Sequence, residues 1–419
     1  MNNNTDKGFS RRDFGKRTAL GATAMAGFSI LNNAQAADDP MKIGVIGCGG
    51  RGSGAVMNAI QANSNVQLVA VCDVFEKRAK DVVNKFKNNE NLVKNINVDA
   101  ENIFWDLDGY KKLLKLDLDY VILATPPGFR PEHFEAVVNA GKNCFCEKPI
   151  AVDSTGTRRY MAAAKKSENA KLHVVTGTQR RHQKPYMETI KKIHDGALGD
   201  IVAGRAYWNG TLPHHRPRKA GMSDLEYQLY NWYNFCWICG DNIVEQHVHN
   251  LDIMNWVFQS HPKSVVASGG RAWKPKTEEY GNIWDHFSCD YEYPNDVHVM
   301  SFSRHWNKSY NDVSEMVFGT KKGPKGYISS CNDMGSNGRN PYVQEHMDLQ
   351  ASITGNGPYL NEGLQVAESV FTAIMGRMAA YTGKKLTWEE ALNMELDIVP
   401  KNMSWDKPMP ADPIPVPGA

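Results

Sequence analysis

The sequence predicts an α/β fold of two domains, in which a parallel, doubly wound sheet over residues 41–176 precedes an α+β domain over residues 177–400 with an open, mainly antiparallel sheet. Three observations carry this prediction. Short β-branched runs alternate with helical patterns in the first domain, the first run opens into a glycine-rich turn, and four strand-like segments follow one another in residues 263–319.

Residues 1–36 differ from the rest of the chain and are excluded from the fold. The letters SRRDFGK at 10–16 precede a run of small and apolar residues at 18–31 and the letters AQA at 34–36. This order is typical of a twin-arginine signal peptide with an Ala-x-Ala cleavage site. The apolar run contains glycines and is shorter than the roughly 20 residues that a membrane-spanning helix needs. We therefore expect recognition by the twin-arginine export machinery, a periplasmic location and no stable membrane insertion after processing.

The composition restricts the partners. The chain has 419 residues, 42% of them hydrophobic, and a formal net charge of +2, so nucleic acid is not an expected partner.

An exported chain could form disulfides, but Cys48, Cys72, Cys144 and Cys146 lie in or beside predicted strands, where cysteine is usually a buried hydrophobe. The CxxC at 236–239 could be a redox pair or half of a metal site; because it is single and lies among aromatics, two unreactive thiols are favoured.

The first strand leads into the turn that carries most of the functional information in the first domain. Residues 41–52 read MKIGVIGCGGRG, a β-branched run followed by GxGxxG, and a helical pattern continues through Ile60. The glycines of such a turn let the backbone approach a pyrophosphate, and the helix N-terminus adds N–H groups and a positive dipole. The candidate phosphate-binding residues are Gly47, Gly49, Gly50, Arg51 and Gly52.

A second strand is expected in residues 66–74, and its acid Asp73 follows the glycine turn by roughly 20 residues. A carboxylate in this place receives the hydroxyls of the adenosine ribose and repels a 2′-phosphate. No basic residue follows Asp73 before Lys77. This predicts NAD as the cofactor, with NADP less favoured.

The alternation of strands and helices continues to the end of the first domain. Strand-like runs occupy 118–127, 143–149 and 171–177, and a helical pattern at 131–140 separates the first two. Ligands of parallel sheets bind beyond the carboxyl ends of the strands. The residues at the ends of the first two runs are therefore candidates for cofactor binding: Thr125, Pro126, Pro127, Glu147 and Lys148.

Together these motifs resemble the Gfo/Idh/MocA oxidoreductases, the family named for glucose-fructose oxidoreductase and inositol dehydrogenase. The resemblance rests on the strand with GxGxxG, the acid after the second strand, and the letters TPP at 125–127 and EKP at 147–149. It extends to a late helix at 362–381 and to the letters TGKKLTWEEALN, and so covers nearly the whole mature chain. It implies a Rossmann NAD-binding domain and an acid-base Lys148 beside the nicotinamide.

Residues 240–258 show two neighbouring stripes at helical spacing. One stripe is apolar and expected in the core, whereas the other carries Glu245, His249 and Asp252. Glu245 lies one turn before His249, a spacing at which a carboxylate can orient and charge-tune an imidazole. The family's segment here has the form acid-x-x-x-His-x-x-Asp with a catalytic acid and histidine. The resemblance therefore implies catalytic roles for Glu245 and His249 beside Lys148, with Glu245 replacing the more usual aspartate.

A metal site is the alternative for the same segment, since Glu245, His247 and His249 have ligand chemistry that suits zinc. In a continuous helix, however, His247 points away from the other two. No metal is therefore expected, and His247, which takes a place that is commonly glycine in the family, is interpreted as structural.

The substrate pocket is predicted from residue type and from the resemblance, which places an arginine near Arg180 or Arg181 at the site. Aromatic residues and histidines gather in residues 207–237, and tyrosine and tryptophan faces stack on sugar C–H surfaces, although aromatic core is an equal alternative for any one of them. The candidate substrate-binding residues are Arg181, Trp208, His214, Trp232, Tyr233 and Asp252.

The open sheet of the second domain is predicted from strand-like runs at 263–273, 284–293, 296–306 and 312–319. The resemblance implies that this sheet forms a wall or a subunit interface, so we expect a homo-oligomer assembled through it. The proline-rich tail at 401–419 is expected to be extended, on a surface or on a partner subunit.

Three functions are compatible with these features. Because the periplasm has no nicotinamide pool, an exported enzyme must be loaded with cofactor beforehand and must regenerate it in place. The first function is a dehydrogenase that oxidises a hydroxyl of a sugar or glycoside, expected at carbon 3, with retained and internally recycled NAD. The second is a redox-neutral glycosidase or epimerase that uses transient oxidation. The third is a non-catalytic sugar-binding homologue, which the presence of Lys148, Glu245 and His249 argues against.

Overall fold

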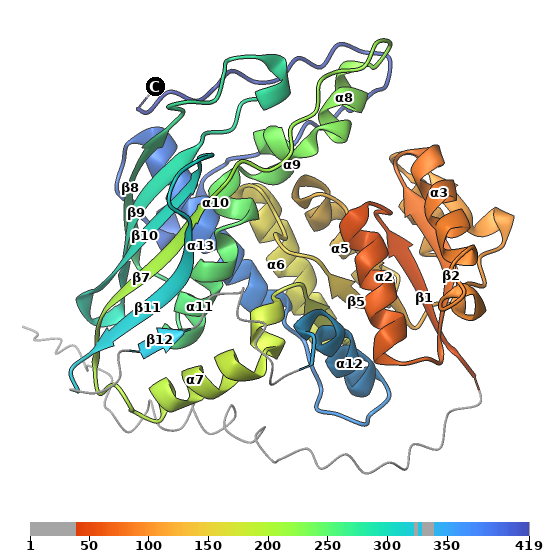
Figure 1. Ribbon diagram of the computed structural model, residues 1–419, viewed down its shortest axis with the longest axis horizontal. Coiled ribbons are helices and arrows are strands. Elements are labelled where there is room, and N and C mark those ends of the chain that lie inside the picture. The colour runs from red at the N-terminus through yellow and green to blue at the C-terminus, as the bar shows by residue number, and fades with distance from the viewer. Residues whose placement is uncertain (1–38, 322–325, 329–338, 419) are drawn as a thin grey trace, which may run out of the picture. The chain divides into compact units, whose positions relative to one another are not determined.

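The computed structural model describes residues 39–321, 326–328 and 339–418, so the predicted signal peptide lies outside the described residues. Figure 1 shows the arrangement of helices and strands. Within the described ranges, no helix combines the length and the apolar character needed to cross a membrane.

The first sheet has six strands in the order β3-β2-β1-β4-β5-β6, and every neighbouring pair is parallel. This order is that of the Rossmann fold, and it reverses between β1 and β4, which opens a crevice beyond their carboxyl ends. The strands are β1 (Met41–Ile46), β2 (Val66–Asp73), β3 (Ile103–Trp105), β4 (Tyr120–Leu123), β5 (Asn143–Cys146) and β6 (Val174–Thr176).

Helices cover both faces of this sheet, which is why its central strands are apolar without alternation. Along β4, Tyr120 and Ile122 enter one core with helices α2 and α3, whereas Val121 and Leu123 enter another with α4, α5 and α6. The helices are α2 (Gly50–Ala62), α3 (Glu76–Lys87), α4 (Gly109–Leu113), α5 (Arg130–Asn139) and α6 (Ser154–Asn169).

The second sheet has seven strands in the order β12-β11-β7-β10-β9-β8-β13, and only the β7–β10 pair is parallel. The predicted fold class is therefore confirmed, although β7 was not predicted as a strand. The strands are β7 (Ile201–Gly210), β8 (Ser264–Gly270), β9 (His286–Tyr293), β10 (Val297–His305), β11 (Asp312–Gly319), β12 (Gly326–Ile328) and β13 (Leu386–Thr387).

The helix expected over residues 240–258 is interrupted. The structure has α10 (Asn242–Glu245) and α11 (Val248–Phe258), separated by Gln246 and His247. At the break the His247 N–H donates to the carbonyl of Asn242, five residues earlier, at 3.4 Å, so this turn is wider than an α-helical one. The side chains before and after the break therefore do not follow one continuous stripe.

The chain returns to the first sheet after completing most of the second. Helix α12 (Pro341–Ile353) packs against α2, and its Gln350 amide donates to the Ala59 carbonyl and to the Tyr120 hydroxyl, both at 3.1 Å. Leu349 of α12 belongs to the same core as α2 and α3. The remaining helices include α7 (Lys184–His194), α13 (Gly363–Thr382) and α14 (Trp388–Asn393), and α13 packs against β8, β9 and α11.

Candidate active site

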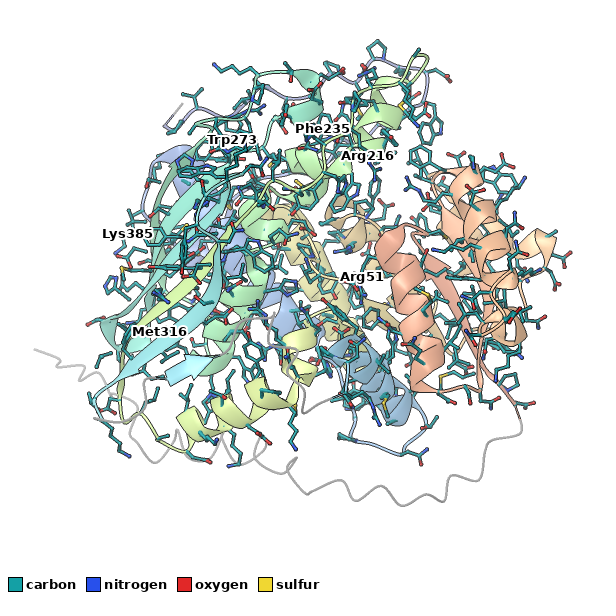
Figure 2. All side chains as sticks on the ribbon, viewed as in Figure 1. Arg51, Arg216, Phe235, Trp273, Met316 and Lys385 are labelled. Carbon is teal, nitrogen blue, oxygen red and sulfur yellow. The ribbon has the colours of Figure 1, made fainter. Side chains whose placement is uncertain are left out.

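A cavity of about 790 Å³ lies beyond the carboxyl ends of the parallel strands, where the strand order reverses. Arg51 reaches it from α2 and Arg216 from the segment after β7 (Figure 2). Most residues predicted to bind cofactor or substrate line it: Gly47, Gly49, Gly50, Arg51, Gly52, Asp73, Thr125, Pro126, Glu147, Lys148, Trp208, His214, Trp232, Glu245 and His249.

The glycine turn has the form that a pyrophosphate cradle requires. Gly47 has φ +96°, a left-handed conformation, and a Cβ on Gly52 would lie 1.8 Å from the Gly47 carbonyl oxygen. A Cβ on Gly49 or Gly50 would meet nothing within 4 Å, so the backbone at the N-terminus of α2 is open to a ligand. Free N–H groups, a positive helix end and an open approach together fit a dinucleotide phosphate.

Asp73 ends β2 at the far side of the turn, where an adenosine ribose would lie. Its carboxylate accepts the Cys48 N–H at 2.8 Å and the Phe75 N–H at 3.0 Å, and burial raises its pKa. Arg78 Nη1 lies 3.7 Å from Asp73 Oδ1 and lines the same cavity. The sequence analysis missed Arg78 because it considered only the residues up to Lys77.

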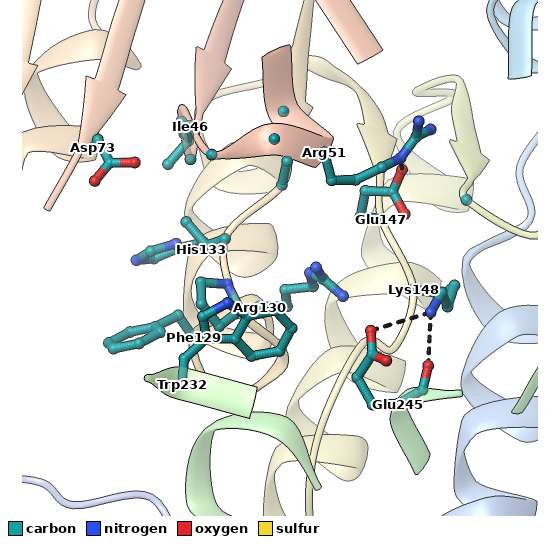
Figure 3. A pocket seen from close by; sticks show the side chains of 18 of the residues that line it. Ile46, Arg51, Asp73, Phe129, Arg130, His133, Glu147, Lys148, Trp232 and Glu245 are labelled. Atoms are coloured by element: carbon teal, nitrogen blue, oxygen red, sulfur yellow. Dashed lines mark hydrogen bonds and ion pairs between the residues drawn. The ribbon is translucent and has the colours of Figure 1, made fainter. Parts of the chain in front are cut away.

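Arg51 connects the glycine turn to the Glu-Lys-Pro segment. Its guanidinium is hydrogen-bonded to the Glu147 carboxylate (Figure 3), and its Nη2 lies 3.8 Å from Glu345 Oε2 on α12. Burial would raise the pKa of Glu147, but Arg51 and Arg130 outweigh it and lower that pKa. Burial raises the pKa of Glu345 well above its usual value.

Lys148 and Glu245 meet inside the cavity. Lys148 Nζ donates to the backbone carbonyl of Glu245 at 2.6 Å and lies 3.3 Å from its Oε1, as Figure 3 shows. The second carboxylate oxygen of Glu245 accepts the Gln246 amide at 2.8 Å. The Lys148–Pro149 peptide is cis. The ammonium is thus held in place by residues of the second domain.

His249 lines the cavity, but the expected contact with Glu245 is absent. Among the described residues its imidazole makes no hydrogen bond; it stacks on Trp208 with ring centroids 5.9 Å apart and an interplanar angle of 25°. The helix break at Gln246 accounts for the difference, because Glu245 turns to Lys148 instead. Burial, assisted by Lys148 and other cations, lowers the pKa of His249 well below its usual value. Burial and these cations therefore favour the neutral form of the imidazole.

Four residues predicted for the site do not line the cavity. Arg181 and Asp252 form an ion pair at 2.8 Å, the Arg181 guanidinium lies over Trp256 and Ser369 also donates to Asp252. Their charges are satisfied by each other, which is why they are structural here. Tyr233 is buried next to Trp232, and Pro127 is buried.

Several lining residues were missed by the sequence analysis. Arg130 is 5% exposed, donates to the Pro149 carbonyl, and has no carboxylate within ion-pair distance in the described ranges. It follows the Thr-Pro-Pro letters closely, which was a usable signal. Tyr342 comes from α12, far along the chain, and its ring lies under Arg51 at 4.7 Å. No local pattern could have placed it here. Other missed lining residues are His133, Gln179, Gln183, Arg216 and Gln246.

The predicted structural residues lie outside the cavity. His247 is fully buried, and its Nε2 is 2.7 Å from Ser301 Oγ of β10. In the described part of the chain, no three histidine, cysteine or acidic side chains are grouped as a metal would need. Cys236 and Cys239 are buried free thiols, and burial raises the pKa of each.

Comparisons with known proteins agree with this geometry. Residues 41–176 match the family described as "Oxidoreductase family, NAD-binding Rossmann fold", and residues 186–323 match the "GFO/IDH/MocA C-terminal domain". Among curated proteins, the chain is 28% identical over 227 residues to an inositol 2-dehydrogenase of Salmonella typhimurium, covering 54% of this chain and 56% of that protein. It is 27% identical over 200 residues to a "Glycosyl hydrolase family 109 protein" of Streptomyces coelicolor, covering 48% of this chain and 39% of that protein. The chain thus spans about half the length of the curated relatives it matches.

Solved structures show the same fold at low sequence identity. One is scyllo-inositol dehydrogenase from Lactobacillus casei with bound NAD(H) and scyllo-inositol, with a TM-score of 0.62 and 16% identity, covering 83% of this chain and 99% of that one. Another is the WlbA dehydrogenase from Bordetella pertussis in complex with NADH and UDP-GlcNAcA, with a TM-score of 0.63 and 16% identity, covering 83% and 98%. With both of its domains matched, the chain belongs to the Gfo/Idh/MocA family of oxidoreductases.

Proposed function

We propose that the protein is an NAD-dependent oxidoreductase that oxidises a CH–OH group of a sugar or a cyclic polyol. The observation that carries the proposal is the grouping of Lys148, Glu245 and His249 in the cavity that also contains the open glycine turn. A bound nicotinamide ring supplies a hydride acceptor for the carbon that carries the hydroxyl.

The chain's own residues supply proton transfer and orientation. The neutral His249 imidazole accepts the hydroxyl proton as the C–H hydride departs, and Lys148 donates a hydrogen bond to the same oxygen. Glu245 holds Lys148 in place through its carbonyl and its carboxylate. Trp208 packs along the His249 ring and limits its rotation.

NAD rather than NADP is the proposed cofactor. Two backbone N–H groups hold the Asp73 carboxylate at the position where it would accept the ribose hydroxyls. Its negative charge there repels a 2′-phosphate. Arg78 beside it reduces this repulsion. Asp73→Ser with Val74→Arg should shift the ratio of NAD to NADP affinity towards NADP by about tenfold or more, measured by fluorescence titration. A wild-type protein that already prefers NADP would contradict the assignment.

The proposed substrate is a carbohydrate hydroxyl, with carbon 3 of a hexose unit as the proposed position. Trp208 and Trp232 present aromatic faces to the cavity, and His214 adds a polar group at its rim. The relatives named for inositol and the neighbouring complex with scyllo-inositol support the substrate class.

We also propose a periplasmic location with the cofactor retained, which follows from the twin-arginine letters at residues 10–16. A homo-oligomer through the second sheet is proposed as well. Its outer side exposes Val266 (53%) on β8 and Met300 (50%) and Phe302 (37%) on β10, the two strands that flank β9. Met316 of β11 belongs to the same sheet (Figure 2).

The function is tested with the purified mature protein and no added cofactor. It is incubated with inositols, glucose and alkyl or aryl glucosides, and the products are analysed by mass spectrometry. A product two mass units lighter than its substrate is expected, together with NAD(H) released on denaturation. If all substrates return unchanged, also with added NAD and a carbonyl acceptor, the proposal fails.

A redox-neutral glycosidase is the second candidate, and the similarity to the glycosyl hydrolase family 109 protein favours it. The same oxidation would make a neighbouring proton acidic, so that the aglycone could be eliminated. Addition of water to the resulting double bond and return of the hydride to the carbonyl would then give the cleaved sugar. The incubation separates the two functions, because the glycosidase yields cleaved sugar without net oxidation. Solvent deuterium would enter that sugar next to the oxidised carbon.

A further inference from the structure

The C-terminal tail, residues 398–418, contains neither helix nor strand. Hydrogen bonds hold it to the rest of the chain at both ends and at points between them. It leaves the first domain where the Ile398 N–H donates to Asp153 Oδ2 at 2.8 Å. It ends against the second domain, where the Pro415 carbonyl accepts the Trp284 indole at 3.0 Å and the Gly418 N–H donates to the Tyr381 carbonyl at 3.0 Å. Figure 1 shows the tail passing α8 (Asp224–Tyr230) on its way to the C-terminus.

Trp405 is the point at which the tail contacts the loops of the first sheet. Its indole N–H donates to Asp106 Oδ1, in the loop after β3, at 2.9 Å. Its ring centroid lies 6.4 Å from that of Phe75, in the loop after β2. A few residues later, the backbone of Met409 makes two hydrogen bonds to α8. Its N–H donates to Asp224 Oδ2 at 2.8 Å, and its carbonyl accepts the Gln228 amide at 2.6 Å.

A shared apolar cluster holds these loops, the tail and α8 together. The cluster includes Leu225 and Leu229 of α8, which are nearly fully buried. Partly buried residues from the loops after β2, β3 and β4 and from the tail pack on it, among them Val74, Phe75, Leu107, Phe129, Met403, Trp405 and Met409. The tail is therefore packed in place as well as hydrogen-bonded.

The tail lies next to one end of the cofactor cavity. A second cavity of about 380 Å³ is lined by Trp405, Trp105 and Glu226, and it shares Val74, Phe75 and Asp106 with the main cavity. In a Rossmann fold the adenine lies beyond the acid that binds its ribose, beside the residues that follow the second and third strands. With Asp73 as that acid, the shared residues mark the adenine end.

We propose that the C-terminal tail, latched by Trp405, closes the adenine end of the cofactor cleft and limits the rate at which the dinucleotide leaves. The proposal rests on the proposed function to the extent that NAD(H) binds in this cavity. Because the tail is anchored on both sides of Trp405, the adenine can leave through this end only after the indole has moved away from Asp106 and Phe75.

The test measures the release of NADH from the full mature chain. Bound NADH is followed by its fluorescence after mixing with an excess of a dehydrogenase and substrate that oxidise free NADH at once. Trp405→Ala removes both the ring contact and the hydrogen bond, and the release rate should rise about tenfold. Trp405→Phe keeps a ring and loses only an exposed hydrogen bond, so about two- to threefold is expected. Val416→Ala, at an exposed tail position, is the matched control and should release NADH at the wild-type rate.

The outcomes separate this inference from the proposed function. If the wild type binds NADH and both Trp405 variants release it at the wild-type rate, the inference is wrong and the function stands. If the wild type binds no dinucleotide in a direct titration, both fail. Thermal unfolding of each variant without cofactor shows whether Trp405→Ala is still folded; where it is not, Trp405→Phe decides alone.

Discussion

The two halves of the active-site cavity are built in different ways. The phosphate-binding part of the cofactor half comes from one strand, one turn and one helix that are contiguous in sequence, and it presents the backbone of Gly47, Gly49 and Gly50. The catalytic half is assembled from side chains on separate segments, with Lys148 held by Glu245 from the other domain. Local sequence therefore dictates the first half, whereas tertiary packing decides the second.

This difference predicts that substitutions in the glycine turn act on folding and cofactor binding together. Gly52→Ala would place a Cβ 1.8 Å from the Gly47 carbonyl oxygen, and neither backbone segment can move without displacing α2 from β1. We expect the free energy of unfolding to fall by more than about 4 kcal/mol and NADH binding to be lost. Chemical denaturation and fluorescence titration measure the two effects.

The matched control for that substitution is Gly54→Ala, one turn into the same helix. A Cβ there meets only Arg51 Nη1 at 3.8 Å. It should raise the free energy of unfolding by about 0.5–1 kcal/mol and leave NADH binding intact. If Gly54→Ala lowered the free energy of unfolding and NADH binding as much as Gly52→Ala, the close packing of the glycine turn would not be the cause of the effect.

Substitutions in the catalytic half should affect rate without affecting cofactor binding. Lys148→Ala and His249→Ala remove groups that exchange or hold the substrate proton, and each should lower kcat by about 10²–10⁴. NADH affinity measured by titration should stay within a few fold, because the glycine turn is untouched. His247→Ala is the control: it faces Ser301, outside the cavity, and should lower stability while retaining turnover. If His247→Ala abolished turnover and His249→Ala did not, the assignment of His249 would be wrong.

Substitution of the Arg181–Asp252 pair tests whether these two residues belong to the catalytic half or only stabilise the fold. Because the pair is nearly buried and lies outside the cavity, Asp252→Asn should lower the free energy of unfolding by about 2–4 kcal/mol and leave KM unchanged. The exposed pair Lys77–Asp81 provides a comparison, and Asp81→Asn should cost less than about 0.5 kcal/mol. A large rise in KM for Asp252→Asn with little loss of stability would show that Asp252 binds the substrate.

The smallest expected effect is on the pH dependence. The pKa of His249 lies well below that of a free imidazole, mainly through burial and also through Lys148. The proton-accepting form therefore persists as the pH falls, and kcat/KM should decline on the acid side only below about 6.5, the ordinary histidine value. A pH–rate profile with a controlling pKa above that of free histidine would contradict the neutral imidazole.

Particular residues show how far sequence reasoning reached. The parallel sheet, the glycine turn, Asp73, Glu147 and Lys148 were predicted because each belongs to a motif whose members are close in sequence. Most of the second sheet was predicted from period-two alternation. Strand β7 was missed, because residues 207–210 were counted in an aromatic cluster and residues 201–206 were assigned no strand.

The failures around the site have separate causes. Glu245 and His249 were correctly brought into one cavity, but their mutual contact was inferred from a continuous helix that in fact breaks at Gln246. Arg181 and Asp252 were assigned to the substrate although they satisfy each other. Tyr342 could not be found because its helix reaches the cavity only through tertiary packing on α2.

The return of α12 to the first sheet has a consequence for biosynthesis. The Gln350 amide caps the end of α2 through the Ala59 carbonyl, a contact that joins positions 291 residues apart. On the ribosome, strands β1 to β6 emerge long before α12, so one face of their sheet stays partly bare until the chain is almost finished. Tyr342 and Glu345, which contact Arg51 at the cavity, arrive with the same late helix. These contacts to Arg51 therefore cannot form until α12 has been translated.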